Sequence, residues 1–217
     1  CRGMDFSRLV DLTRPMCPGQ PKFPTDPDME IHSLTAAGPD SFEVLSYRLA
    51  GPWGTHVDAP GHAVPGGRTL AEIPPAELIM PLAVIPLTGA PSLTAAGIRA
   101  WERAHGQVPA GGFVALHTGW TDHNSPGTPG WALDAVELLH ARGVRAIGHD
   151  TLNTDPGALT ALGEYPAQRF WLSRDHWQVE FLTNLDQVPA TGATMWVSWP
   201  VPAGGSSFPT RALALLP

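Results

Sequence analysis

A nine-residue segment, Gly54-Thr-His-Val-Asp-Ala-Pro-Gly-His62, contains the side chains best suited to chemistry in this chain. His56 and Asp58 are two residues apart, so both side chains leave the same face of an extended strand. An imidazole and a carboxylate that converge in this way are suitable ligands for zinc or manganese. Pro60 lacks an N–H group and must end regular strand pairing, so the chain can turn and bring His62 back as a proton carrier.

The composition is that of a globular protein, with 43% hydrophobic and 15% charged residues among 217. This length supports one substantial core, and we expect a single domain over residues 1–217. The formal net charge of −7 disfavours nucleic acid and anionic membrane as partners, because both attract a basic surface. No apolar run approaches the roughly 20 residues of a membrane span, and no signal peptide is visible.

Cys1 and Cys17 are the only cysteines in the sequence. Two cysteines give no disulfide framework, and no Cys-x-x-Cys pair exists to hold zinc, although a single Cys1–Cys17 bridge stays open as an alternative. This usage favours a reducing cytoplasm as the location. Any metal must then be held mainly by nitrogen and oxygen ligands.

Alternating strand and helix patterns predict an α/β domain that carries its site residues at strand ends. Prolines at three-residue spacing predict an extended, loop-rich segment over residues 5–30. Thr94 is a suitable cap for a helix, and Gly143 a suitable terminator. The expected strands are 42–49, 78–87, 112–117, 144–148 and 194–199, and the expected helices are 94–104 and 130–142.

Six further landmarks accompany the nine-residue segment along the chain. They are Asp11-Leu-Thr, Thr118-Gly-Trp, Ala146-Ile-Gly-His-Asp-Thr, Glu180-Phe-Leu-Thr-Asn-Leu-Asp, Val188-Pro and Ser207-Phe-Pro-Thr-Arg211. In these segments, spread over about residues 10–213, the chain resembles the metal-dependent cyclase family, which includes bacterial kynurenine formamidases and isatin hydrolases. The resemblance implies a swivelling β/β/α-type fold with a mixed sheet, a homodimer and a site for one or two metal ions.

The resemblance also implies roles for individual residues. Three of the family's metal ligands correspond to His56, Asp58 and Glu180, and its catalytic histidine corresponds to His62. The first ligand histidine of the family is replaced here by Pro52, which cannot bind a metal through its side chain.

The distant ligand histidine of the family is replaced by Gln168, which offers a weaker, neutral oxygen. We therefore expect one divalent ion rather than a two-metal cluster, with zinc or manganese favoured and magnesium as an alternative. His149 stands where the hydrolases more often carry an apolar residue. It is a candidate to replace the lost imidazole at the site, and the alternative is a hydrogen-bonded loop histidine.

Each candidate also has an ordinary structural interpretation. His56 by itself would be a strand histidine, and Asp58 a turn residue ahead of a proline. His62 could simply close a loop, and Glu180 could be a solvated or salt-bridged carboxylate. The complete nine-residue segment makes the ligand interpretation the stronger one for the first two residues.

Trp53 and Trp120 flank the polar motifs and are candidates for walls of a substrate pocket. The alternative for both is core packing, because tryptophan buries a large apolar area.

Together these features predict a metal-dependent hydrolase that cleaves a C–N bond, in an amide or cyclic amide, through metal-activated water. The expected substrate is a small aromatic or apolar molecule, and His62 would carry the proton to the leaving nitrogen. Two alternatives stay open, since fold resemblance alone cannot choose among them. One is a metal-dependent cyclisation, dehydration or lactone opening, and the other is a non-catalytic small-molecule-binding protein.

Overall fold

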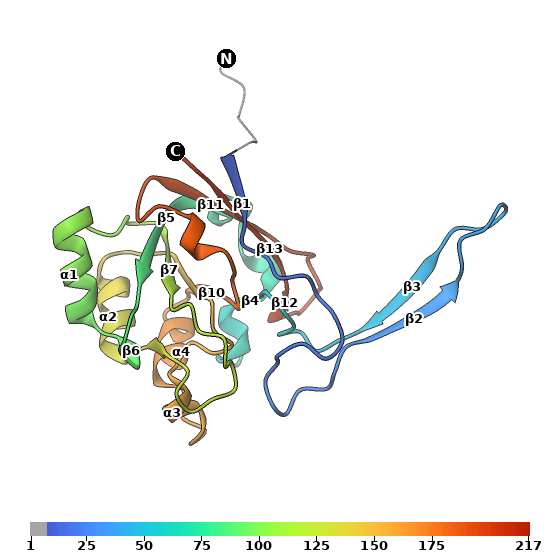
Figure 1. The fold of residues 1–217 in the computed structure, drawn as a ribbon, viewed down its shortest axis with the longest axis horizontal. Coiled ribbons are helices and arrows are strands. Elements are labelled where there is room, and N and C mark those ends of the chain that lie inside the picture. The colour runs from blue at the N-terminus through green and yellow to red at the C-terminus, as the bar shows by residue number, and fades with distance from the viewer. Residues whose placement is uncertain (1–7) are drawn as a thin grey trace, which may run out of the picture.

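A curled mixed sheet forms the centre of the computed structural model, which describes residues 8–217 (Figure 1). Its nine strands within that range are β1 (Leu9–Asp11), β4 (His56–Asp58), β5 (Ile79–Pro86), β7 (Phe113–His117), β9 (Ala146–His149), β10 (Trp177–Glu180), β11 (Ala193–Ser198), β12 (Ser207–Pro209) and β13 (Arg211–Leu215). They follow the order β1-β13-β11-β5-β7-β9-β10-β4-β12. The four neighbours β5, β7, β9 and β10 are parallel, and the remaining pairings are antiparallel.

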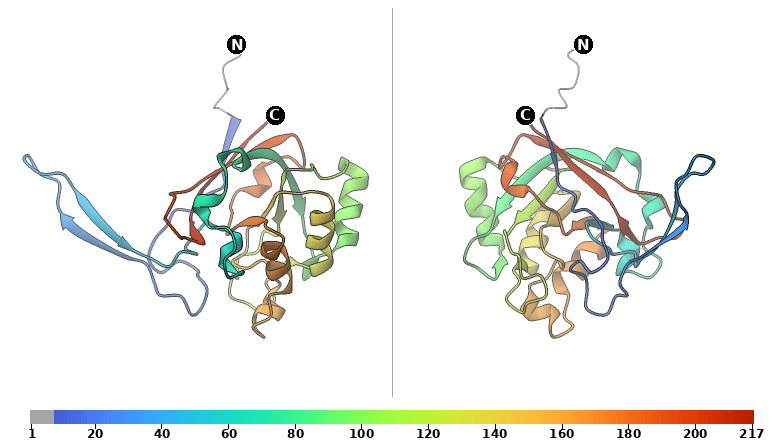
Figure 2. Two further views of the ribbon diagram at one scale, coloured as in Figure 1. Left: turned by 180° about the vertical axis from the view of Figure 1, so that it is seen from behind. Right: turned by 45° about the vertical axis from the view of Figure 1, so that its right-hand side comes forward.

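Four helices complete the described part of the chain, together with short 3₁₀ turns. They are α1 (Ala95–His105), α2 (Leu133–Ala141), α3 (Gly157–Thr160) and α4 (Pro166–Ser173). The helices α1, α2 and α4 lie on one side of the central parallel strands, as Figures 1 and 2 show. A small parallel pair, β6 (Ser92–Leu93) and β8 (Gly130–Trp131), lies beside them. This mixed arrangement confirms the predicted α/β class.

Apolar side chains cover both faces of the central parallel strands. Along β7, Phe113 and Ala115 belong to the core inside the curl of the sheet, whereas Val114 and Leu116 face the core beneath the helices. Because successive side chains alternate between the two faces, a strand buried on both sides has a continuous apolar sequence. The double core fixes the strands whose ends carry the polar side chains described below.

A two-stranded hairpin made of β2 (Glu30–Thr35) and β3 (Val44–Arg48) projects away from this body (Figures 1 and 2). All six residues of β2 are exposed. The segment between β1 and the hairpin has turns but no helix or strand, which confirms the loop-rich prediction for its described part.

Most expected elements are present with small shifts in their ends. The helix α1 begins directly after Thr94, whose side chain accepts a hydrogen bond from the Gly97 amide as predicted for a cap. The predicted helix 130–142 is wrong at its start, because Gly130–Trp131 pairs with Ser92–Leu93 and the helix begins at Leu133. The strands expected at 42–49, 78–87, 112–117, 144–148 and 194–199 are β3, β5, β7, β9 and β11.

Cys17 is exposed, and Cys1 lies outside the described residues, so the open Cys1–Cys17 pairing stays a prediction. Across residues 8–217, each helix is too short or too polar to cross a lipid bilayer.

His176 is buried immediately before β10, against the helical layer. Its ring stacks on that of Trp171 with centroids 4.1 Å apart, and its Nε2 lies 2.8 Å from Nδ1 of His140. Burial, reinforced by His140, lowers the pKa of His176 to about 4. The unfolded chain binds this proton near pH 6.5, so the neutral form stabilises the fold above that pH, and this contribution is lost as the pH falls toward 4.

Replacing His176 with Gln should therefore reduce the acid sensitivity of the fold. Between pH 7 and 4.5, this residue should lower the free energy of unfolding of the wild-type protein by about 2 kcal/mol, measured by urea denaturation. His32→Gln, on the exposed hairpin, is the control and should keep the wild-type loss. An equal loss in His176→Gln would contradict the assignment.

Candidate functional site

The pairing of β4 with β10 brings polar residues from distant parts of the chain onto one face of the sheet. In this antiparallel register His56 lies opposite Glu180, and Asp58 lies opposite Gln178. Because side chains alternate along a strand, all four point to the same side. The predicted ligands His56, Asp58 and Glu180 are thus brought together.

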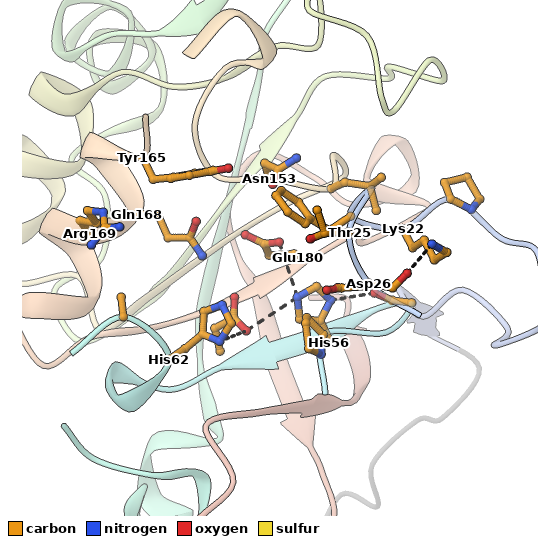
Figure 3. A pocket seen from close by; sticks show the side chains of 17 residues that line it. Lys22, Thr25, Asp26, His56, His62, Asn153, Tyr165, Gln168, Arg169 and Glu180 are labelled. Carbon is orange, nitrogen blue, oxygen red and sulfur yellow. Dashed lines mark hydrogen bonds and ion pairs between the residues drawn. The ribbon is translucent and has the colours of Figure 1, made fainter. Parts of the chain in front are cut away.

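These three residues form a compact, buried cluster that could hold a metal ion. One ligand atom from each lies within 4.8 Å of the others. Nε2 of His56 is 3.7 Å from Oδ1 of Asp58 and 3.5 Å from Oε2 of Glu180. The three residues are only 4%, 1% and 5% exposed. Figure 3 shows the side chains of His56 and Glu180 pointing toward one another among the residues that line the pocket.

A backbone carbonyl orients the imidazole of His56. Its Nδ1 donates to the carbonyl oxygen of Gly54 at 2.9 Å, so Nε2 is directed at the two carboxylates. Gly54 has a φ of +62°, a left-handed conformation that glycine adopts at low cost. A metal-binding histidine is held in the same manner by a hydrogen bond to its second nitrogen.

The donor atoms of the cluster fit a cation. Within residues 8–217, Nε2 of His56 and Oδ1 of Asp58 are buried and have no hydrogen-bond partner. Burial by itself lowers the pKa of His56, but the charges of Asp58 and Glu180 outweigh it and raise the pKa to about 9. Burial raises the pKa of Glu180, but the neighbouring imidazoles of His149 and His56 lower it by more, and the net effect is a lowered pKa. The Glu180 carboxylate therefore stays ionised, and its negative charge favours a cation at this point.

Behind the cluster lies a buried amide that the sequence interpretation missed. Nε2 of Gln178 donates to Oδ2 of Asp58 at 3.1 Å and to Oε1 of Glu180 at 2.9 Å. The Thr154 hydroxyl lies 2.9 Å from Oε1 of Gln178 and 3.0 Å from Oε1 of Glu180. These contacts occupy one oxygen of each carboxylate. The available signal was the spacing, because a residue two before Glu180 on a strand shares its face.

His62 lies at the edge of the cluster, on the short 3₁₀ turn Pro60–His62. Its Nδ1 is 3.9 Å from Oδ1 of Asp58, and the side chain lines the cavity in front of the cluster. Pro60 thus begins a turn that returns His62 to the site, as predicted.

A cavity of about 550 Å³ opens onto the cluster. Helix α4 and the residue before it contribute Tyr165, Gln168 and Arg169 to its wall (Figure 3). The N-terminal loop contributes another part of the wall, including Phe23. The remaining lining residues are Pro21, Lys22, Thr25, Asp26, Pro52, Gly54, His56, Asp58, His62, Ala63, Leu152, Asn153 and Glu180.

Of the other predicted site residues, only Gln168 lines this cavity. Trp53 is fully buried and packs in the interior, so it forms no part of the wall. Trp120 lies in the loop after β7, where its Nε1 donates to the carbonyl oxygen of Asp122 at 2.7 Å. The aromatic walls come instead from Phe23 and Tyr165, which lie in segments where no sequence pattern indicated a pocket.

His149 lies behind the cluster rather than in the cavity wall. It is fully buried at the end of β9, and Nε1 of Trp131 donates to its Nδ1 at 3.3 Å. This bond leaves the hydrogen on Nε2, which lies 3.5 Å from Oε1 of Glu180. His149 therefore orients Glu180 in this arrangement.

Comparisons with known proteins agree with this fold. The family described as Putative cyclase matches residues 10–156. An isatin hydrolase from Roseibium aggregatum is 31% identical, over 96% of this chain and 92% of its own. A kynurenine formamidase from Paracidovorax citrulli is 29% identical, over 74% of this chain and 76% of its own.

A solved isatin hydrolase bound to the product analogue thioisatinate superposes with a TM-score of 0.86 at 29% identity, covering 96% of this chain and 92% of that chain. A structure described as a potential metal-dependent hydrolase with cyclase activity has a TM-score of 0.77 at 25% identity, covering 95% and 96%. The predicted swivelling fold is thus confirmed.

Replacing Gln178 with Met should weaken metal binding, because both carboxylates lose the amide that orients them. The loss of such an outer partner lowers metal affinity by about 10- to 100-fold. Isothermal titration of the metal-free protein with Mn²⁺ measures it, and Gln187→Met on an exposed 3₁₀ turn is the matched control. Wild-type affinity in a folded Gln178→Met protein would contradict this role.

Proposed function

This chain belongs to the putative cyclase family, and from that premise we propose that it is a metal-dependent hydrolase of an amide C–N bond. The observation that carries the proposal is the buried cluster of His56, Asp58 and Glu180, with His62 beside it, at the base of a cavity. The relatives named as isatin hydrolase and kynurenine formamidase support this reaction class.

His56, Asp58 and Glu180 would hold one divalent ion, with zinc or manganese preferred and magnesium as an alternative. The hydrogen bonds of Gln178 support a single ion, because they leave one free oxygen on each carboxylate. Gln168 is proposed as a fourth, neutral oxygen donor from the cavity wall. When bound, the ion lowers the pKa of water from about 16 toward 7 and polarises the substrate carbonyl.

His62 is proposed to carry the proton between the attacking water and the leaving nitrogen. Its place at the edge of the cluster, half-exposed to the cavity, suits a group that gains and loses a proton. An amide needs this step, because an amine leaves poorly without a proton. Asp58 lies within ion-pair distance of Nδ1 and would stabilise the protonated ring.

The cavity supports a small aromatic substrate. Its volume of about 550 Å³ is in the range of small-molecule sites. Phe23 and Tyr165 supply aromatic surface, whereas Asn153 and Gln168 supply neutral hydrogen-bonding groups. This combination fits a cyclic amide or an N-formyl aromatic amine.

His62→Ala should lower kcat by about 10²- to 10⁴-fold, because general acid–base catalysis is lost, while the Mn²⁺ content stays at the wild-type level. The assay is hydrolysis of isatin and of N-formyl aromatic amines, with metal content measured on the same samples. His105→Ala, on the exposed side of α1, is the control. Full activity in His62→Ala would exclude the proton-transfer role, and turnover of lactones alone would contradict the amidase assignment.

We also propose a homodimer in which the β2–β3 hairpin packs against a second copy. An isolated two-stranded hairpin is marginally stable in water and needs further packing. Phe42 at its tip is 90% exposed, and Leu34 is 66% exposed. Further exposed apolar side chains on the hairpin are Ile31, Val44 and Tyr47.

The assignment of residues 1–217 to a single domain and the cytoplasmic location stay predictions.

Phe42→Asp should shift the protein toward monomer, because a charge would replace the largest exposed apolar side chain of the hairpin. Sedimentation velocity over a dilution series measures the dissociation constant, which should rise by about tenfold or more. Leu162→Asp changes an exposed leucine outside the hairpin and should leave the dimer intact. A wild-type protein that sediments as a monomer would exclude the dimer.

A further inference from the structure

Helix α4 begins without a capping side chain of its own. Tyr165 precedes it and makes no side-chain cap, and Pro166 has no N–H to satisfy. The Arg169 amide donates to the Tyr165 carbonyl at 3.0 Å. This leaves the amides of Ala167 and Gln168 in need of acceptors.

Asp155, eleven residues before α4, supplies both acceptors. Its Oδ1 accepts from the Ala167 amide at 2.7 Å, and its Oδ2 accepts from the Gln168 amide at 3.0 Å. The residue is only 1% exposed. A buried carboxylate that uses both oxygens on one helix start acts as a cap from outside the helix, and charged acceptors make the stronger hydrogen bonds.

The preceding residue, Thr154, makes the contacts behind the metal cluster. Its hydroxyl, with one hydrogen to donate, lies within hydrogen-bond distance of Oε1 of both Gln178 and Glu180. The Thr154 carbonyl also accepts from the Trp131 amide at 2.8 Å. A Cβ added at Gly130 would lie 2.6 Å from the backbone of Thr154–Pro156, so this loop packs directly on β8. Contacts with β8 and β10 therefore hold Thr154 and Asp155 in place.

We propose that Thr154-Asp155 is a brace that sets the position of α4 relative to the metal ligands. Thr154 holds the Glu180 carboxylate, and Asp155 holds the helix that presents Gln168 to the cavity. Helix α4 also packs against the Pro60–His62 turn, so its position bears on His62 as well. Both residues are positioning residues, and the inference rests on the proposed metal-dependent function.

The two halves of the brace give different results when changed. Thr154→Val keeps the shape of the side chain and removes the hydroxyl, so Mn²⁺ affinity should fall through Glu180. Asp155→Asn keeps one acceptor, so the amides of Ala167 and Gln168 should exchange hydrogen faster and Mn²⁺ affinity should fall through Gln168. Each loss of affinity should be about tenfold.

A double-mutant cycle on Mn²⁺ affinity separates positioning from general destabilisation. If Asp155 acts through Gln168, Asp155→Asn should lower the affinity in the wild-type background and have no further effect in Gln168→Ala. Asp134→Asn, which removes an exposed carboxylate from the first turn of α2, is the matched control and should change neither affinity nor exchange.

Equal losses from Asp155→Asn in both backgrounds would overturn the proposal, and so would unchanged exchange at Ala167 and Gln168. Wild-type Mn²⁺ affinity in Thr154→Val would show that Thr154 does not position Glu180. Titration and hydrogen exchange need no substrate. If the wild-type protein hydrolysed none of the amides tested, only the hydrolase proposal would be excluded. The roles of Thr154 and Asp155 would still be measured by these two methods.

Discussion

The register of β4 against β10 is the constraint on which the site depends. It places His56 opposite Glu180 and Asp58 opposite Gln178, so that an imidazole, two carboxylates and an amide share one face. A shift by one residue would turn one strand's set to the opposite face, since side chains alternate along a strand. The pairing therefore does more than hold the sheet together, because it assembles the ligand set itself.

The double core keeps that register in place. β10 pairs in parallel with β9, and β9 with β7, while apolar side chains cover both sides of these strands. The polar cluster lies on β10, the last of these parallel strands, and on its antiparallel neighbour β4. Buried carboxylates next to each other repel, and here the amide of Gln178 and the imidazoles of His56 and His149 offset the repulsion. The carboxylate oxygens that Gln178 does not contact face the cavity, where a cation fits.

Much of the framework could be predicted from the sequence, because it depends on local patterns. Apolar runs gave the central strands, and Thr94 gave the start of α1. The start of α2 was missed because Gly130–Trp131 pairs with residues almost forty positions earlier, and no local propensity reports such a partner. The position of Trp53 beside the polar motif suggested a pocket wall, yet the fold buries it completely. Burial depends on neighbours that only the folded chain supplies.

The sequence by itself determined the chemical types at the site, since an imidazole and a carboxylate two residues apart on a strand must share a face. It also indicated His62, because a proline turn follows the strand. The family resemblance indicated Glu180, but only the tertiary structure decided how the distant groups meet. Strand pairing brings Glu180 and Gln178 to the His56–Asp58 pair, and Asp155 caps the helix that carries Gln168. These contacts join parts of the chain that local sequence rules cannot connect.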